Sequence, residues 1–302
     1  MKLYILMFAS LLLTVAKNEP TEGLIYLSRD GGQQWTTMDT GLPDDAAINA
    51  WVVFQNSVVV GTESHGIYIS DNAFKSWKRS STGLPASVKI NALLANKNTL
   101  LAGTYQHGIY ISYNEGSTWQ ATTKGIGLTS VRCFFMHHGI IFAGTTDGIF
   151  VSNDQGRSWQ SVQRGFQVNT FASDNERIFA ATNIGIYRST DSGKTWIASL
   201  NKGAFANLAA DQDKLVAVMF DGRAYISSDH GMLWLDNAPF LDQYTFKLTP
   251  VGRKIPSAPW RDSLFIYYYQ QLAGRNGLPN KNFSLLLRTP YGILATASHD
   301  GC

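Results

Sequence analysis

The chain has 302 residues, of which 44% are hydrophobic and 16% charged, and this balance excludes a disordered chain or a coiled coil. Aromatic residues make up 12% and there are 27 glycines, a mixture typical of many short strands joined by tight turns. The formal net charge is only +3 and Lys and Arg form no long run, so we expect no nucleic-acid partner.

The first 16 residues have the pattern of a signal peptide. A basic start at Lys2 precedes an apolar run from Leu3 to Val15, and the small residue Ala16 ends it. This core is shorter than the ~20 residues that a spanning helix needs. We therefore expect residues 1–16 to be removed on export, residues 17–302 to form the mature domain, and the protein to be secreted or periplasmic. An uncleaved anchor is the alternative. No second apolar run approaches membrane length.

One motif, Ser-x-Asp-x-Gly-x-x-Trp, recurs six times, with successive Trp residues 37 to 42 positions apart. That spacing is the length of one four-stranded propeller blade. In a hairpin turn the carboxylate or amide accepts backbone N–H groups, the Gly adopts a positive φ, and the Trp packs under the turn. We therefore expect structural roles for Asp30, Asn72, Asn114, Asp154, Asp191 and Asp229, and for Trp35, Trp77, Trp119, Trp159, Trp196 and Trp234.

The second copy departs from the motif, because Phe74 stands where the others have Gly. A side chain at a position that favours positive φ predicts a different backbone path for this turn.

A second pattern lies upstream of the later boxes and completes the repeat. Before the second, third and fourth boxes it reads Gly-Thr, a short loop, then Gly-Ile-Tyr or Gly-Ile-Phe, and weaker versions precede the fifth and sixth boxes. It follows two apolar runs, such as Ile90 to Ala95 and Thr99 to Ala102. Each period therefore predicts four short strands, A to D, with the box between C and D. Cys133 falls in one of the apolar runs and Cys302 is the last residue, so we expect a buried thiol and a terminal thiol rather than a disulfide.

With six boxes at this spacing, the chain resembles the BNR/Asp-box propellers. This superfamily includes sialidases, xyloglucan-degrading hydrolases, sortilin-type receptors and photosystem II assembly-factor propellers. The resemblance covers nearly all of the mature chain and implies an all-β propeller of four-stranded blades. The same box serves enzymes and receptors, so it predicts the fold better than the function.

The two ends of the chain predict how the propeller is completed. Strands C and D near Gly23 to Tyr26 lack their own A and B, which Ser284 to Arg288 and Ile293 to Ala297 supply. We expect the N- and C-terminal strands to share one blade, which removes exposed strand edges. Residues 238–280 lack a box, and their length predicts one degenerate blade and seven in all. Six blades with a long insertion is the alternative.

The loops between strands B and C, with those between D and A, lie on the rim opposite the boxes and form the candidate ligand face. His and Asp are also ordinary turn residues. His65 and His107 could share a metal ion, but the sequence identifies no third ligand, so we expect neither metal nor other cofactor. The candidate ligand residues are His65, Tyr105, His107, Asp147, Asp221, His299 and Asp300.

The resemblance to sialidases implies three arginines, a Tyr activated by a Glu, and an Asp, and the sequence does not supply that set. The family's Arg-Ile-Pro element is only loosely matched by Arg253 to Pro256, which follows the last box. The xyloglucan hydrolases use acids in a cleft between two propellers, whereas one is expected here. We therefore expect no catalytic residues and a secreted propeller that binds a protein or glycan through its loop face. A glycoside hydrolase is the alternative, and an assembly factor for a membrane complex is the third hypothesis. The oligomeric state is not indicated.

Overall fold

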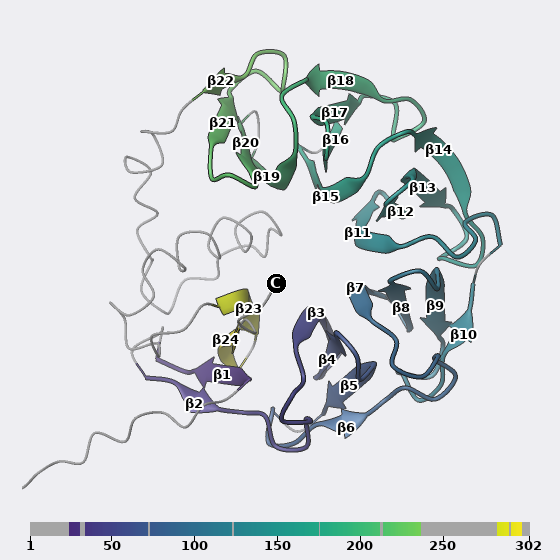
Figure 1. The fold of residues 1–302 in the computed structure, drawn as a ribbon, viewed down its shortest axis with the longest axis vertical. Coiled ribbons are helices and arrows are strands. Elements are labelled where there is room, and N and C mark those ends of the chain that lie inside the picture. The colour runs from purple at the N-terminus through teal and green to yellow at the C-terminus, as the bar shows by residue number, and fades with distance from the viewer. Residues whose placement is uncertain are drawn as a thin grey trace, which may run out of the picture.

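The computed structural model describes residues 24–30, 34–71, 73–122, 124–174, 176–211, 214–236, 283–289 and 291–297. These residues form six antiparallel four-stranded sheets and no helix, hence no helix that could cross a membrane. The sheets radiate from a common centre like propeller blades (Figure 1). The predicted all-β propeller is confirmed for this part of the chain.

Blades 2 to 6 follow one another along the chain, each with its first strand at the centre and its fourth at the rim (Figure 1). Blade 2 contains β3 (Ile48–Phe54), β4 (Ser57–Thr62), β5 (Ile67–Ser70) and β6 (Lys78–Arg79). Blade 3 contains β7 (Ile90–Asn96), β8 (Thr99–Thr104), β9 (Ile109–Ser112) and β10 (Gln120–Ala121). Blade 4 contains β11 (Val131–His137), β12 (Ile140–Thr145), β13 (Gly148–Ser152) and β14 (Gln160–Arg164). Blade 5 contains β15 (Val168–Ser173), β16 (Ile178–Thr182), β17 (Ile186–Ser189) and β18 (Ile197–Leu200). Blade 6 contains β19 (Phe205–Asp211), β20 (Lys214–Met219), β21 (Ala224–Ser227) and β22 (Leu235–Asp236).

Blade 1 is assembled from both ends of the described chain. Strands β1 (Ile25–Ser28) and β2 (Thr36–Thr37) combine with β23 (Phe283–Thr289) and β24 (Gly292–Ala297). Strands β1 and β24 pair antiparallel, with Ile25 opposite Thr296 and Ser28 opposite Ile293. The predicted sharing of one blade by the two ends is confirmed. Residues 237–282 lie outside the described part of the chain, so a seventh blade in addition to the six observed sheets stays a prediction. The predicted signal peptide and the terminal thiol of Cys302 also lie outside the described residues.

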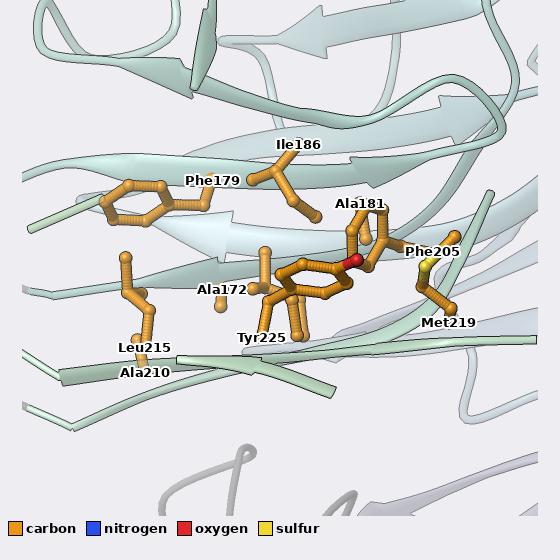
Figure 2. Close-up of a cluster of buried hydrophobic side chains, with 11 residues drawn as sticks. Ala172, Phe179, Ala181, Ile186, Phe205, Ala210, Leu215, Met219 and Tyr225 are labelled. Carbon is orange, nitrogen blue, oxygen red and sulfur yellow. The ribbon is translucent and has the colours of Figure 1, made fainter. Parts of the chain in front are cut away.

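The hydrophobic core lies between neighbouring blades. Figure 2 shows one such layer, in which Phe179 and Ile186 of blade 5 lie with Phe205, Leu215 and Tyr225 of blade 6. All five side chains are buried. Each blade face is covered by the next blade, so strands B and C are apolar on both faces and read as continuous apolar runs rather than alternating ones.

The Asp box is a turn held by its own side chains. In blade 4 the Ser152 hydroxyl donates to Oδ1 of Asp154 at 2.8 Å and accepts the N–H of Gly156 at 2.8 Å. The same Oδ1 accepts the N–H of Ser158 at 2.9 Å. The boxes of blades 3, 5 and 6 repeat this arrangement. Polar groups that a tight turn leaves unpaired are thereby satisfied.

The Trp of the blade 3 box also joins its blade to the preceding blade. The Trp119 indole N–H donates to the Ser80 carbonyl oxygen at 2.8 Å, and its backbone N–H donates to Thr82 at 2.8 Å. Gly83 lies against Trp119 with φ +92°, and a Cβ there would overlap the Trp carbonyl oxygen. This close contact explains why the Gly-Leu-Pro segment at residues 83–85, which opens the next period, begins with Gly. Four indoles are buried, in Trp77, Trp119, Trp159 and Trp196, whereas Trp35 and Trp234 are partly exposed.

The predicted change of path in the second box is wrong. Phe74 has φ +69° and donates its N–H to the Ser70 hydroxyl, as the box Gly does elsewhere. Its ring is buried and meets the Tyr291 ring of blade 1 edge-on, at 5.6 Å between centroids. Contact of this ring with blade 1 offsets the cost of positive φ in a non-glycine residue. Asn72 itself lies outside the described residues.

Cys133 on β11 is a free cysteine of intermediate exposure, so it is less completely covered than the buried thiol that the sequence predicts. Burial raises the pKa of this thiol to about 12, and the nearby Arg132 only partly opposes the shift. Its sulfur lies on the blade face beside Gly144, where a Cβ would overlap it. The group therefore stays a neutral packing element at physiological pH.

Candidate functional site

A buried threonine builds the turn between strands B and C. In blades 2 to 5 the hydroxyl donates to the carbonyl oxygen of the turn Gly, at 2.7 to 3.0 Å. The threonine hydroxyl oxygen in turn accepts the backbone N–H of His65, His107 or Asp147 in the first three of these blades. The Gly-Thr pattern of the sequence therefore positions the candidate ligand residues.

The B–C loop of each blade is tied to the segment that enters the same blade from its neighbour. Backbone N–H groups of the loop donate to carbonyl oxygens of the entering segment at 2.9 to 3.4 Å. These pairs are Glu63 to Ala47, Tyr105 to Lys89, Thr146 to Ser130, Asn183 to Gln167, and Phe220 to Ala204. B–C and D–A loops thus lie together at one end of each blade, and we call this end the loop face.

Ion pairs hold most of the charged side chains of the loop face. The Glu63 carboxylate lies 2.7 Å from the Lys89 ammonium, and His65 Nε2 lies 3.0 Å from an oxygen of Asp45. Partial burial raises the pKa of Glu63, but hydrogen bonds from Lys89 and Asn49 outweigh it and lower that pKa below its ordinary value. The loop is therefore fixed by its polar groups.

Two candidate aspartates are paired in the same way. Asp147 lies 2.9 Å from Arg164, and Asp221 lies 2.8 Å from Arg223. Hydrogen bonds from the side chain and backbone of Arg223 lower the pKa of Asp221. The Asp221 carboxylate is therefore charged at neutral pH.

Large apolar side chains of the loop face remain open to solvent. Phe220 is 65% exposed, Tyr105 48% and Ile184 44%, all three in B–C loops. Leu128, in the D–A loop before β11, is 67% exposed. The Tyr105 ring carries the Lys89 ammonium 5.9 Å from its centroid. Ile184 and Phe220 lie in the B–C loops predicted to form the ligand face, but neither they nor Leu128 were singled out as ligand residues. Propensity alone does not tell a buried apolar residue from an exposed one.

The sequence analysis also missed a set of mostly polar residues on the innermost strands. Each innermost strand of the six described blades has a register shift after its first residue, and the bulged position carries a polar residue in five blades and Ala206 in blade 6. The five polar residues are Asn49, Asn91, Arg132, Asn169 and Ser284. The Asn91 amide donates to the Val131 carbonyl oxygen and the Asn169 amide to that of Phe205, each in the next blade. Recurrence of Ile-Asn-Ala in β3 and β7 is the signal that could have revealed them.

The predicted candidates occupy separate loops rather than one cluster. His65, Tyr105, His107, Asp147 and Asp221 belong to four different blades. His299 and Asp300 lie outside the described residues. Within the described ranges, no three His, Cys, Asp or Glu side chains are close enough to hold a metal ion.

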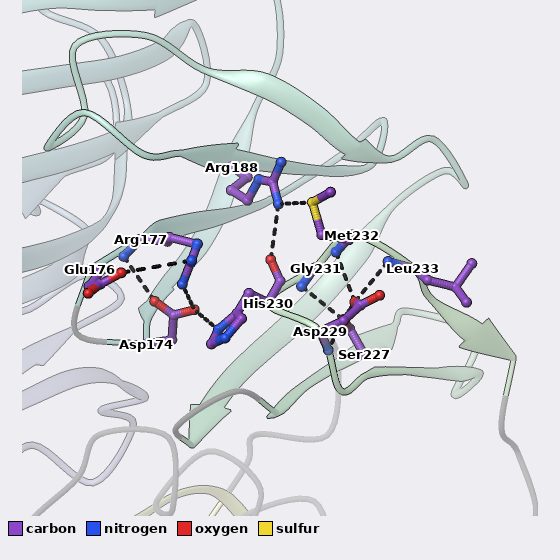
Figure 3. A network of polar contacts seen from close by, with 10 residues as sticks. All are labelled: Asp174, Glu176, Arg177, Arg188, Ser227, Asp229, His230, Gly231, Met232 and Leu233. Atoms are coloured by element: carbon purple, nitrogen blue, oxygen red, sulfur yellow. Dashed lines mark hydrogen bonds and ion pairs between the residues drawn. The ribbon is translucent and has the colours of Figure 1, made fainter.

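A buried ion pair lies at the opposite end of the blades, among the box turns (Figure 3). The Asp174 side chain is fully buried in the β15–β16 turn, and one oxygen lies 2.8 Å from Nδ1 of His230 in the box of blade 6. Arg177 donates to the same oxygen at 3.2 Å. This network joins blades 5 and 6, and no pattern in the sequence predicts it.

Comparisons with known proteins agree on the fold. Residues 4–133 match the family described as the DUF6242 beta propeller domain. No curated protein matches the chain significantly. Among solved structures it is similar to YCF48 bound to D1 peptide, with 16% identity and a TM-score of 0.56 over 94% of this chain and 95% of that one.

Two further structures have the same architecture. A GH74 xyloglucanase from Xanthomonas campestris is 18% identical, with a TM-score of 0.56 over 74% of this chain and 46% of the enzyme. The computationally designed Ika8 protein is 16% identical, with a TM-score of 0.54 over 71% of each chain. This chain thus spans less than half the length of the xyloglucanase.

Taken with the six sheets, these findings identify the chain as a β-propeller. The predicted resemblance to propeller proteins is confirmed at the level of the fold. At identities of 16–18% the similarity concerns the fold, which enzymes and other proteins share.

Proposed function

We propose that this protein is an exported, non-enzymatic propeller whose loop face binds a protein partner. The observation that carries the proposal is the set of exposed apolar side chains on that face, Tyr105, Ile184, Phe220 and Leu128. Exposed aromatic and aliphatic groups on a rigid scaffold are typical of interaction surfaces.

The way the loops are fixed supports binding. The charged groups of the B–C loops are engaged in ion pairs within the protein, as in Glu63 with Lys89 and Asp221 with Arg223. The apolar groups are left to make outside contacts. A surface fixed before the partner arrives loses less conformational entropy on binding.

The same pairs disfavour a glycoside hydrolase. Such an enzyme needs a general acid whose pKa is raised, so that the group is protonated at working pH. On the loop face the pKa values of Glu63 and Asp221 are lowered instead, and Asp147 is paired with Arg164. These carboxylates suit structural roles better than proton donation.

A protein rather than a glycan partner is favoured by one of the similar structures. YCF48 was solved with a D1 peptide, and the similarity runs over nearly the full length of both chains. This supports a peptide segment as the bound element here. An assembly role with a membrane complex would be one biological setting for such binding.

The test is a binding screen with purified protein. The immobilised chain is exposed in parallel to a displayed peptide library and to a glycan array. We expect peptide ligands, and we expect Phe220→Ser or Tyr105→Ser to weaken them at least about tenfold, as loss of an interface hot spot does. Leu233→Ser, an equally exposed apolar position on the box side, is the control and should leave affinity unchanged.

Two results would overturn the proposal. One is selective binding of glycans that Phe220→Ser and Tyr105→Ser abolish, which would make the loop face a sugar site. The other is turnover of sialosides or glucans that disappears in Asp147→Asn, which would make the protein a hydrolase.

A further inference from the structure

A second candidate site lies on the box side, between blades 2 and 3. It is a pocket of about 420 Å³ lined by Gln55 of the β3–β4 turn, Asn98 of the β7–β8 turn, and Tyr113, Asn114 and Glu115 of the blade 3 box. In an antiparallel blade the A–B and C–D turns share one end and the B–C and D–A loops the other. The pocket is therefore at the end opposite the loop face.

Tyr113 is the unusual member of this pocket. It follows the box Ser, at a position where the other boxes carry polar or charged residues, namely Arg29, Asp71, Asn153, Thr190 and Ser228. Its ring is 44% exposed, and the Arg157 guanidinium lies 5.9 Å from the ring centroid. The other five blades form without an aromatic residue directly after the box Ser, so the fold does not require the Tyr113 ring.

The polar side chains of the pocket have hydrogen-bonding capacity to spare. Within the described part of the chain, the side chains of Gln55, Asn98 and Glu115 make no hydrogen bond or ion pair, whereas Asn114 is engaged with Ser112 and Thr118 inside the box. Primary amides both donate and accept, and a carboxylate accepts from two donors. Hydroxyl groups, which also donate and accept, are the complementary ligand groups.

Charge narrows the ligand class further. The box of blade 3 has Asn114 where blades 4 to 6 have Asp, so Glu115 is the one formal charge among the five lining residues. The Arg157 guanidinium beside the Tyr113 ring supplies an opposite charge next to the pocket, so the two charges offset each other and the pocket favours a neutral ligand over an acidic or basic one. The negative face of an aromatic ring attracts the slightly positive C–H groups of an apolar surface.

We propose that this pocket binds a neutral hexopyranose unit of a glycan. Tyr113 packs against the C–H face of the sugar ring, and Gln55, Asn98 and Glu115 pair with its hydroxyl groups. The pocket is shallow, so affinity for one sugar unit falls in the range of about 1–10 mM, as for a small ligand with few buried atoms. This site is separate from the loop face and does not depend on the function proposed for it.

Saturation-transfer and two-dimensional NMR titrations of the full chain test the proposal. The probes are methyl glycosides of glucose, galactose and mannose, with glucuronic acid and N-acetyl-lysine methyl ester as charged comparisons. We expect at least one neutral glycoside to shift the resonances of Gln55, Asn98 and Tyr113. Tyr113→Ala should weaken that binding about tenfold, and Asn98→Ala should weaken it less.

The loop face supplies a matched control. Tyr105 is also an exposed tyrosine with a cation 5.9 Å from its ring, so Tyr105→Ala should leave the glycoside titration unchanged. Circular dichroism at the same temperature confirms that each variant is folded. The proposal is overturned if no glycoside shifts the pocket resonances, if a charged probe shifts them more strongly, or if Tyr113→Ala binds as the wild type does. None of these results bears on peptide binding by the loop face.

Discussion

Two corners of the propeller occupy corresponding places on the box side and differ in how they are filled. Between blades 5 and 6, His230 lies 2.8 Å from the buried carboxylate of Asp174. Between blades 2 and 3, the corresponding box residue is Glu115, and a pocket of about 420 Å³ remains. The box backbone is alike in both, with φ of +59° at His230 and +58° at Glu115. The repeat thus sets the backbone conformation of the box. The side chain before the box Gly decides whether the box contacts the preceding blade, as His230 does, or borders a pocket, as Glu115 does.

The largest expected effect concerns the indoles beneath the two corners. Trp119 is buried under the open corner and donates to the preceding blade, so Trp119→Ala should lower the free energy of unfolding by about 3–5 kcal/mol. Trp234, under the sealed corner, is partly exposed, so Trp234→Ala should cost clearly less. Chemical denaturation with fluorescence detection measures both. Equal losses would mean that indole burial does not set how firmly each blade is held.

An intermediate effect is expected at the ion pair itself. His230→Ala removes one partner of a buried carboxylate and should cost about 1.5–3 kcal/mol, the usual range for hydrogen bonds to charged groups. The control is Glu115→Ala, at the corresponding box position of the open corner, which should stay within about 0.5 kcal/mol of wild type. If the two variants were equally stable, the Asp174–His230 contact would not stabilise the junction of blades 5 and 6.

The smallest effect is a pH dependence of the two boxes. Hydrogen bonding from the Leu233 backbone, with further bonds from Ser227 and Met232, lowers the pKa of Asp229 despite partial burial. A carboxyl with a lowered folded pKa stabilises the fold above its unfolded pKa of about 3.9, and this contribution disappears as pH falls through the folded value. The stability deficit of Asp229→Asn at pH 6 should therefore shrink in acid below about pH 4.

The open corner supplies the reciprocal experiment. Its box carries Asn114, which does not titrate, so Asn114→Asp should add a small stability at pH 6 that is lost over the same acid range. Thermal melts at a series of pH values measure both variants. A deficit of Asp229→Asn that is independent of pH would contradict the role given to the carboxylate charge.

The repeat in the sequence was sufficient to predict most of the fold. The expected strands at Ile90 to Ala95 and Ile293 to Ala297 lie within β7 and β24 as observed, because box spacing and apolar runs are local signals. Phe74 misled the prediction, since its contact with Tyr291 depends on a blade more than 200 positions away in the sequence. Propensity rules include the conformational energy of positive φ at Phe74 itself, but not the stabilisation that its ring gains from a residue far away in the sequence.

The candidate site was less predictable for the same reason. The polar residues of the B–C loops could be located from the Gly-Thr pattern, yet the pairing of Glu63 with Lys89 and of Asp147 with Arg164 depends on which segments lie side by side. The pocket at Tyr113 and the pair of Asp174 with His230 each join blades that are adjacent only after folding. Exposure of Phe220 likewise follows from assembly and not from its own sequence neighbourhood.

The sheet shared by β1 and β24 has a consequence for biosynthesis. A ribosome makes β1 more than 250 residues before its partner β24, so one edge of β1 stays unpaired until the chain as far as β24 has emerged. Bringing together residues so far apart carries a large loop-closure cost, which makes this pairing a natural candidate for the slowest folding event. Early termination of translation would leave that edge open to intermolecular strand addition and hence to aggregation.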